Sequence, residues 1–187
     1  MYKLLPQPPS ETWARKFFDM AQNVSVWSKD RSTKVGAIIF NPETYAMLSV
    51  GYNGFPRGVR DEAKDVTMAD ALRNKPSDVD WRDRIVTMKA AVEARHERPL
   101  KYKWTVHSEL NAILNCARHG ICTDHMAIAL QWYPCMQPCA GAIVQAGIEL
   151  VVCTAPDFNH PRYGEEFKLT KELFDEVGMK VMYLEAR

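Results

Sequence analysis

Apolar residues recur at helical spacing near the start of the chain. The segment 11–22 follows Ser10, a residue type that often caps helix N-termini. The apolar positions of this segment recur every three or four residues, which predicts a helix that packs through one face. The residues on that face are Trp13, Phe17, Met20 and Ala21.

Two β-rich runs come next, over 34–40 and 46–51, and the turn-type residues 41–44 separate them. This pattern predicts a β-hairpin. The eight residues 51–58 then contain three glycines and a proline. Such a composition predicts a loop whose backbone needs unusual torsions or approaches another group closely.

Helices and short strands alternate regularly from residue 106 onward. This alternation favours parallel strands in the second half of the chain. Together with the hairpin, it predicts an α/β fold, a three-layer α/β/α sandwich around a central mixed sheet. The predicted helices are 107–118, 136–146 and 165–177, and the predicted strands are 126–130, 149–153 and 180–184.

The length of 187 residues is typical of one domain, and we interpret residues 1–187 as a single domain. Residues 59–103 mix both signs of charge and include plausible helices at 69–73 and 85–95. The segment 59–103 is too short and too polar to form a core of its own. We therefore interpret it as an insertion.

The overall charge narrows the range of partners. Lys and Arg number 24 and Asp and Glu number 23, so the formal net charge of +1 provides no bulk field to hold a polynucleotide or an anionic membrane. No apolar run reaches the ~20 residues of a membrane span. Three prolines stand in residues 1–10, where a signal peptide would be apolar. We expect no polynucleotide partner, no membrane partner and a soluble intracellular protein.

The five cysteines are odd in number, and all of them follow residue 115. We therefore expect no disulfide framework. We expect the protein to occupy a reducing, cytoplasmic compartment. Cysteines in such a compartment are buried hydrophobes, metal ligands or nucleophiles.

One group of residues has the composition of a catalytic zinc site. His107 and Glu109 open a predicted helix, and Cys135 and Cys139 open the next. One His and two Cys are the ligands of a zinc ion that keeps its fourth position for water. Glu109 is placed to move the proton of that water. The order His-x-Glu and then Pro-Cys-x-x-Cys is typical of zinc-dependent nucleobase deaminases.

The spacing of the two cysteines departs from that pattern by one residue, because this chain has Cys-x-x-x-Cys. Residues at i and i+4 still share one helical face, so we expect one metal to bind both, with Pro138 in an adjusted first turn. The other cysteines and histidines lack such neighbours and are assigned no metal. These are Cys116, Cys122, Cys153, His96, His119, His125 and His160.

Four segments carry a resemblance to a known family. They are HSELNAIL at 107–114, AGAIVQAGI at 140–148, SKDRSTKVGA at 28–37 and GYNG at 51–54. Together with the zinc motif, they resemble the deoxycytidylate deaminase family over roughly residues 10–155. The zinc motif alone indicates only the cytidine deaminase superfamily. The resemblance implies a cytidine deaminase-like fold.

The resemblance also implies an activity, the hydrolytic removal of the amino group of dCMP to give dUMP and ammonia for thymidylate synthesis. It implies that His107, Cys135 and Cys139 bind one Zn²⁺ ion and that Glu109 is the acid and base. It further implies that Asn53 in the glycine loop binds the nucleotide. Ser108 stands where the family usually has alanine, a change that should not disturb the zinc.

A nucleotide substrate also requires a group that contacts its phosphate. Arginine suits this role because its planar fork donates two hydrogen bonds. Arg118 is our first candidate, because it follows His107 by about three helical turns, and Ser28 and Arg31 are second candidates.

Family resemblance implies a homo-oligomer, a hexamer in many members, with dCTP and dTTP as allosteric effectors. Some relatives hold a second, structural zinc through cysteines nearer the N-terminus. This chain has no cysteine before Cys116, so that site cannot form in the same way.

Several alternatives stay open at this point. The substrate could be dCTP, cytidine, a riboflavin precursor or an adenosine in transfer RNA, although RNA would favour a basic surface. A binding module with a structural zinc would need a fourth protein ligand. The chain could also be a pseudoenzyme, an alternative supported only by the extra residue between the two cysteines.

Overall fold

The computed structural model describes residues 9–185, which form two compact units. We call the first the sheet unit, made of residues 9–28, 33–53 and 107–185. The second, the helical unit, consists of residues 29–32 and 54–106. The prediction of a single domain with an insertion at 59–103 stays a prediction.

Within the described residues, five strands form one mixed sheet in the order β2-β1-β3-β4-β5. Strand β1 is antiparallel to both β2 and β3, whereas β3, β4 and β5 are parallel. The hairpin and the parallel second half are thus both confirmed. The strand bounds are β1 Gly36–Phe40, β2 Met47–Tyr52, β3 Ala127–Leu130, β4 Leu150–Cys153 and β5 Lys180–Tyr183.

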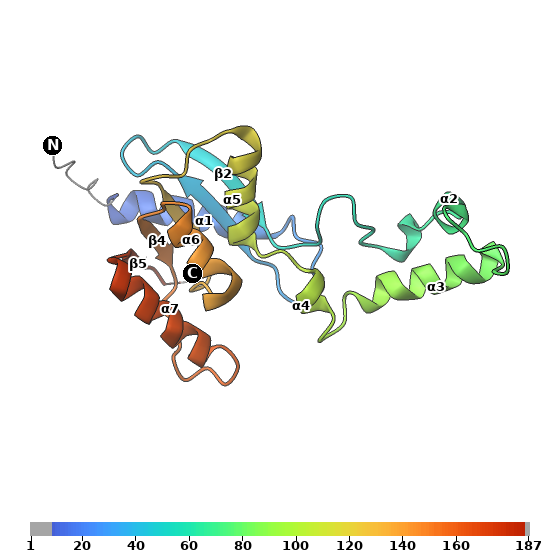
Figure 1. The fold of residues 1–187 in the computed structure, drawn as a ribbon. Coiled ribbons are helices and arrows are strands. Elements are labelled where there is room, and N and C mark those ends of the chain that lie inside the picture. The colour runs from blue at the N-terminus through green and yellow to red at the C-terminus, as the bar shows by residue number, and fades with distance from the viewer. Residues whose placement is uncertain (1–8, 186–187) are drawn as a thin grey trace. The chain divides into compact units, whose positions relative to one another are not determined.

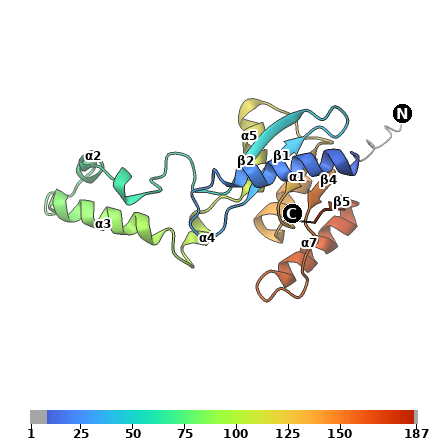
Figure 2. The same ribbon diagram turned by 180° about the vertical axis from the view of Figure 1, so that it is seen from behind.

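Helices cover both faces of this sheet. Helix α1 (Glu11–Ser25) lies on one face, and α5 (Ser108–His119), α6 (Gly141–Gln145) and α7 (Gly164–Val177) lie on the other (Figures 1 and 2). Alternate residues of a strand point to opposite faces. In β1, Ile38 and Phe40 accordingly pack in the core beneath α1, and Ala37 and Ile39 pack in the other core. The predicted three-layer α/β/α sandwich is confirmed.

The predicted packing face of α1 was partly wrong. Trp13 is 36% exposed and Met20 is 44% exposed, whereas Phe17 and Ala21 are buried as expected. The buried face also includes Ala14 and Phe18, and α1 lies close to β1, because a Cβ added at Gly36 would lie 2.0 Å from the Ala21 carbonyl oxygen. Within the described residues, the Ser10 side chain makes no capping hydrogen bond. The buried residues are Ala14, Phe17, Phe18, Ala21, Val24 and Ser25.

The helical unit contains η1 (Ala63–Asp65), α2 (Met68–Leu72), α3 (Trp81–Ala94) and α4 (Lys101–Trp104). Helix α3 begins four residues earlier than predicted, because the Asp80 side chain accepts a hydrogen bond from the Arg82 N–H at 2.7 Å and caps the helix. The buried Lys101 donates to Asp30 at 2.7 Å. This ion pair fastens α4 to residues 29–32.

Within residues 9–185, no helix has both the length and the apolar composition that crossing a membrane requires.

Candidate metal centre

Helix α5 positions two of the predicted site residues. His107 is in the extended conformation at the N-cap position of α5, and Glu109 follows in the first turn. Glu109 is only 7% exposed, and one of its oxygens, Oε2, accepts a hydrogen bond from Ser108 Oγ at 2.9 Å. The free N–H groups at a helix N-terminus favour negative charge, which suits a buried carboxylate in this turn. Ser108 therefore orients the carboxylate.

The segment between the two cysteines is not the regular helix predicted over 136–146. It consists of η2 (Met136–Ala140) followed by α6, and Gln137 is extended, with φ −117° and ψ 130°. The peptide bond between Gln137 and Pro138 is cis. The two cysteines therefore do not lie on one face of a regular helix, whereas the adjusted first turn expected around Pro138 is present, with Gln137 extended.

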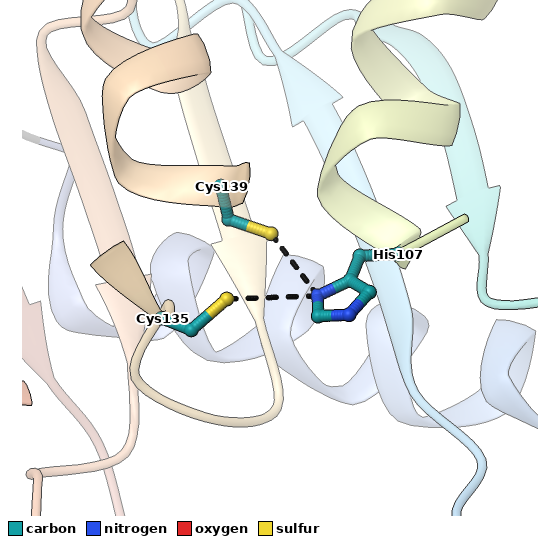
Figure 3. A group of neighbouring side chains, drawn as sticks. All are labelled: His107, Cys135 and Cys139. Atoms are coloured by element: carbon teal, nitrogen blue, oxygen red, sulfur yellow. Dashed lines mark hydrogen bonds between the residues drawn. The ribbon is translucent and has the colours of Figure 1, made fainter. Parts of the chain in front are cut away.

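The structure brings His107, Cys135 and Cys139 together (Figure 3). The Nδ1 atom of His107 lies 3.6 Å from the Cys135 sulfur and 3.3 Å from the Cys139 sulfur. Zinc bonds of ~2.3 Å to sulfur and ~2.0 Å to nitrogen at tetrahedral angles would separate nitrogen and sulfur by about 3.6 Å. The three ligand atoms lie within 4.8 Å of one another. The group therefore fits one tetrahedral zinc ion.

The pKa values of the two cysteine thiols also favour a bound metal ion. A hydrogen bond with Cys139 lowers the pKa of the Cys135 thiol to about 6, against the effect of burial. The pKa of Cys139 is raised by the same neighbour, by burial and by the charge of Glu109. Two adjacent thiols in a buried site cannot both ionise without a nearby cation. Holding both as thiolates is what a divalent metal would do here.

Helix α7 contacts the cysteine segment on both sides of Cys135. Glu166 accepts hydrogen bonds from the backbone N–H groups of Met136 at 3.2 Å and Gln137 at 3.4 Å. The buried Thr170 donates to the Pro134 carbonyl at 3.1 Å. The sequence analysis missed both residues, because nothing in the pattern of 165–177 distinguishes them from other polar residues of a surface helix.

Asn53 and Ser28 lie close together in the sheet unit. The Asn53 side chain accepts from the Val35 N–H at 2.8 Å and donates to the Thr33 carbonyl at 2.8 Å. Ser28 donates to the Asn53 carbonyl at 2.7 Å, and both residues are buried. These contacts hold the segment before β1 against the end of β2. A role of either residue toward a nucleotide stays a prediction.

The structure does not bring Arg118 to the metal ligands. It is exposed in the last turn of α5, and eleven residues at 1.5 Å each separate it from His107 by about 16 Å along the helix axis. Arg31 belongs to the helical unit, where it pairs with Glu93 at 2.8 Å. All five cysteines are free, and Cys116, Cys122 and Cys153 lie outside the metal-ligating group.

Comparison with known proteins provides independent findings. The family model for the cytidine and deoxycytidylate deaminase zinc-binding region matches residues 11–155. An uncharacterized deaminase encoded 3′ of luxG in Aliivibrio fischeri is 35% identical over 92% of this chain and 93% of its own length. The deoxycytidylate deaminase of Enterobacteria phage T2 is 32% identical over 81% of this chain and 85% of its own length.

A solved structure supports the fold. The dCMP deaminase of cyanophage S-TIM5, in complex with dCMP and dUMP, aligns with a TM-score of 0.61 at 20% identity. The alignment covers 94% of this chain and 98% of the cyanophage chain. The five-stranded sheet and its helices therefore have the fold of a known deaminase.

Proposed function

Because the chain belongs to the cytidine and deoxycytidylate deaminase zinc-binding family, we propose that it catalyses the zinc-dependent hydrolytic deamination of dCMP to dUMP and ammonia. The observation that carries this proposal is the buried Glu109 beside the group formed by His107, Cys135 and Cys139. The phage T2 relative, which is named a deoxycytidylate deaminase, supports the choice of dCMP.

His107, Cys135 and Cys139 would hold the metal, and the donor set of one nitrogen and two sulfurs is that of a catalytic zinc rather than a closed structural one. A zinc ion with three protein ligands, when bound, makes water acidic enough to lose a proton near neutral pH. Among the described residues, the group contains no fourth Cys or His. This argues against the alternative of a binding module with a structural zinc.

Glu109 would carry the proton in this reaction. It would take a proton from the attacking water and deliver it to ring nitrogen 3, and a second transfer would protonate the departing amino group at carbon 4. Water supplies the oxygen gained by the base, and ammonia leaves, so the atoms balance. The hydrogen bond from Ser108 supports this role because it restrains the carboxylate beside the two thiols.

Asn53 is our proposed contact to the nucleotide, on the strength of the family resemblance, and Ser28 stays a second candidate for the contact to its phosphate. The distance of Arg118 from His107 does not support a phosphate contact by Arg118 within the same chain. The homo-oligomeric state, regulation by dCTP or dTTP and a cytoplasmic location belong to the same proposal and rest on the resemblance and the free cysteines.

The test uses the full chain loaded with zinc. Initial rates of ammonia release are measured with dCMP, dCTP and cytidine at matched concentrations, each with and without dCTP or dTTP as effector. We expect dCMP to be turned over and cytidine to be a poor substrate. Equal turnover of dCMP and cytidine would overturn the proposal that the enzyme prefers a nucleotide to a nucleoside.

A second measurement tests the role of Glu109. We expect Glu109→Ala to keep its zinc, measured by metal analysis of the purified protein, and to lose activity by ~10²–10⁴-fold. Normal deamination by this variant would overturn the role assigned to the carboxylate.

A further inference from the structure

We propose that Glu166 and Thr170 of α7 are positioning residues that hold Cys135 in place as a metal ligand. This inference rests on the zinc site of the proposed function and deepens it. Neither residue would touch the metal or the substrate. They act through the backbone on either side of Cys135.

The hydrogen bonds enclose Cys135 from both directions along the chain. Thr170 Oγ1 donates to the carbonyl of Pro134, the residue before the cysteine, at 3.1 Å. Glu166 Oε2 accepts from the N–H groups of the two residues after it, Met136 at 3.2 Å and Gln137 at 3.4 Å. The peptide groups flanking Cys135 are thereby tied to one helix. The direction of its Cα–Cβ bond is fixed by the same contacts.

The geometry of the first turn after Cys135 explains why such contacts are needed. Gln137 is extended, and the Ala140 N–H reaches back to the Cys135 carbonyl at 3.0 Å to close the first turn. The N–H groups of Met136 and Gln137 lie at the start of that turn, so they have no carbonyl partner within the helix. Unpaired N–H groups in a partly buried segment are costly. The carboxylate of Glu166 satisfies both of them.

Helix α7 is a firm support for these contacts. Glu166 and Thr170 are four residues apart, so they share one face of the helix. Phe167 and Phe174, which are buried in the core of the sheet unit, anchor the same helix. A side chain held by a packed helix places its partner more reproducibly than one on a loop does. Because α7 is anchored in the core, its hydrogen bonds hold the backbone around Cys135 in one position.

The test compares metal binding by variants of the full chain. Zinc affinity is measured by competition with a chromophoric chelator, and cobalt(II) substitution reports the cysteine–metal bonds through thiolate-to-metal charge-transfer absorption. The variants are Glu166→Ala, Glu166→Gln, Thr170→Val and Thr170→Ser. Glu165→Ala is the matched control, because Glu165 is exposed, carries the same charge on the same helix and pairs with Lys168.

We expect Glu166→Ala to weaken zinc binding by ~10–100-fold, the range typical when a group that orients a metal ligand is removed. Its cobalt charge-transfer band should weaken or shift. Thr170→Val should act in the same direction. Glu166→Gln and Thr170→Ser retain an acceptor and a donor, respectively, so both should recover most of the affinity.

Circular dichroism of the zinc-free variants establishes that they fold. If Glu166→Ala does not fold, the comparison of Thr170→Val with Thr170→Ser decides the question in its place. The inference is overturned if Glu166→Ala, or in its place Thr170→Val, matches Glu165→Ala in both affinity and cobalt spectrum. Failure of the unaltered chain to bind zinc would instead overturn the proposed function, so the two failures are distinguishable.

Discussion

Gly51 of β2 packs directly against α5, the helix whose first turn carries Glu109 and whose N-cap is His107. A Cβ atom added at Gly51 would lie 2.1 Å from the Ser108 carbonyl oxygen and 2.4 Å from the Ala112 nitrogen. Both neighbours are backbone atoms of α5, so no side chain can rotate away to make room. The change Gly51→Ala must therefore displace α5 from the sheet.

The required displacement follows from these distances. Real Cβ atoms hardly ever approach within 3.0 Å of another heavy atom, so the Ser108 backbone would have to move by roughly 0.9 Å. Overpacking of this kind costs ~1–3 kcal/mol, and contact with backbone on two sides favours the upper end of that range. A shift of ~1 Å in a catalytic group can lower the rate by ~10²-fold. Because Ser108 lies between His107 and Glu109, both effects should appear together.

The assay combines urea unfolding with steady-state deamination of dCMP. We expect Gly51→Ala to lose about 3 kcal/mol of unfolding free energy and roughly 100-fold in kcat/KM. The matched control is Gly141→Ala in α6, where an added Cβ meets nothing within 4 Å and where alanine should stabilise the helix by ~0.5–1 kcal/mol. If Gly51→Ala proves as stable and as active as Gly141→Ala, the close contact between β2 and α5 does not hold the site together.

Three further predictions concern the catalytic carboxylate, the metal and the helical unit. Glu109→Gln should retain zinc and lose dCMP deamination by ~10²-fold or more, because the amide cannot carry a proton; retained activity with bound zinc would contradict this. Removing zinc with a chelator should abolish activity and lower the melting temperature, since zinc at 100 times its Kd contributes ~2.7 kcal/mol to the folded state. Activity that persists in metal-free protein would refute the role of the His107 group. In the helical unit, a hydrogen bond from Arg60, with further bonds from Thr67, holds the pKa of the Asp70 carboxyl well below its usual range. A lowered folded-state pKa stabilises the protein above the unfolded pKa, so this contribution should be lost as pH falls below roughly 4. Urea midpoints measured across that range should decline less steeply for Asp70→Asn than for the unaltered chain. The exposed Asp78 provides the control, and an equal response to Asp78→Asn would contradict the assignment.

The sequence pattern predicted the secondary structure better than it predicted which faces of the helices are buried. The hairpin and the parallel strands were predicted correctly because period-two alternation and buried apolar runs are written locally in the chain. The packing face of α1 was only half correct. Trp13 and Met20 were expected on the packing face, but the face buried against the sheet is the one bearing Ala14 and Phe18. The periodicity of apolar residues does not determine which face of α1 is buried, because that depends on the shape of the sheet surface against which the helix packs.

The residues of the candidate site were likewise predictable only in part. His107, Glu109, Cys135 and Cys139 could be named in advance, because metal coordination demands particular residue types at short spacings. Arg118 shared a helical face with His107 in sequence, yet the rise along the helix places it at the other end.

The alternation that builds a mixed sheet and the set of nitrogen and sulfur donors could be read from the chain alone. The folded chain was needed to show that Gln137 is extended, that Gly51 lies against α5 and that Glu166 and Thr170 enclose Cys135. Periodicity and side-chain chemistry act within one element, whereas these contacts join separate elements. The contact between Glu166 and Met136 joins residues 30 positions apart, and it exists only because α7 packs on the sheet beside the cysteine segment.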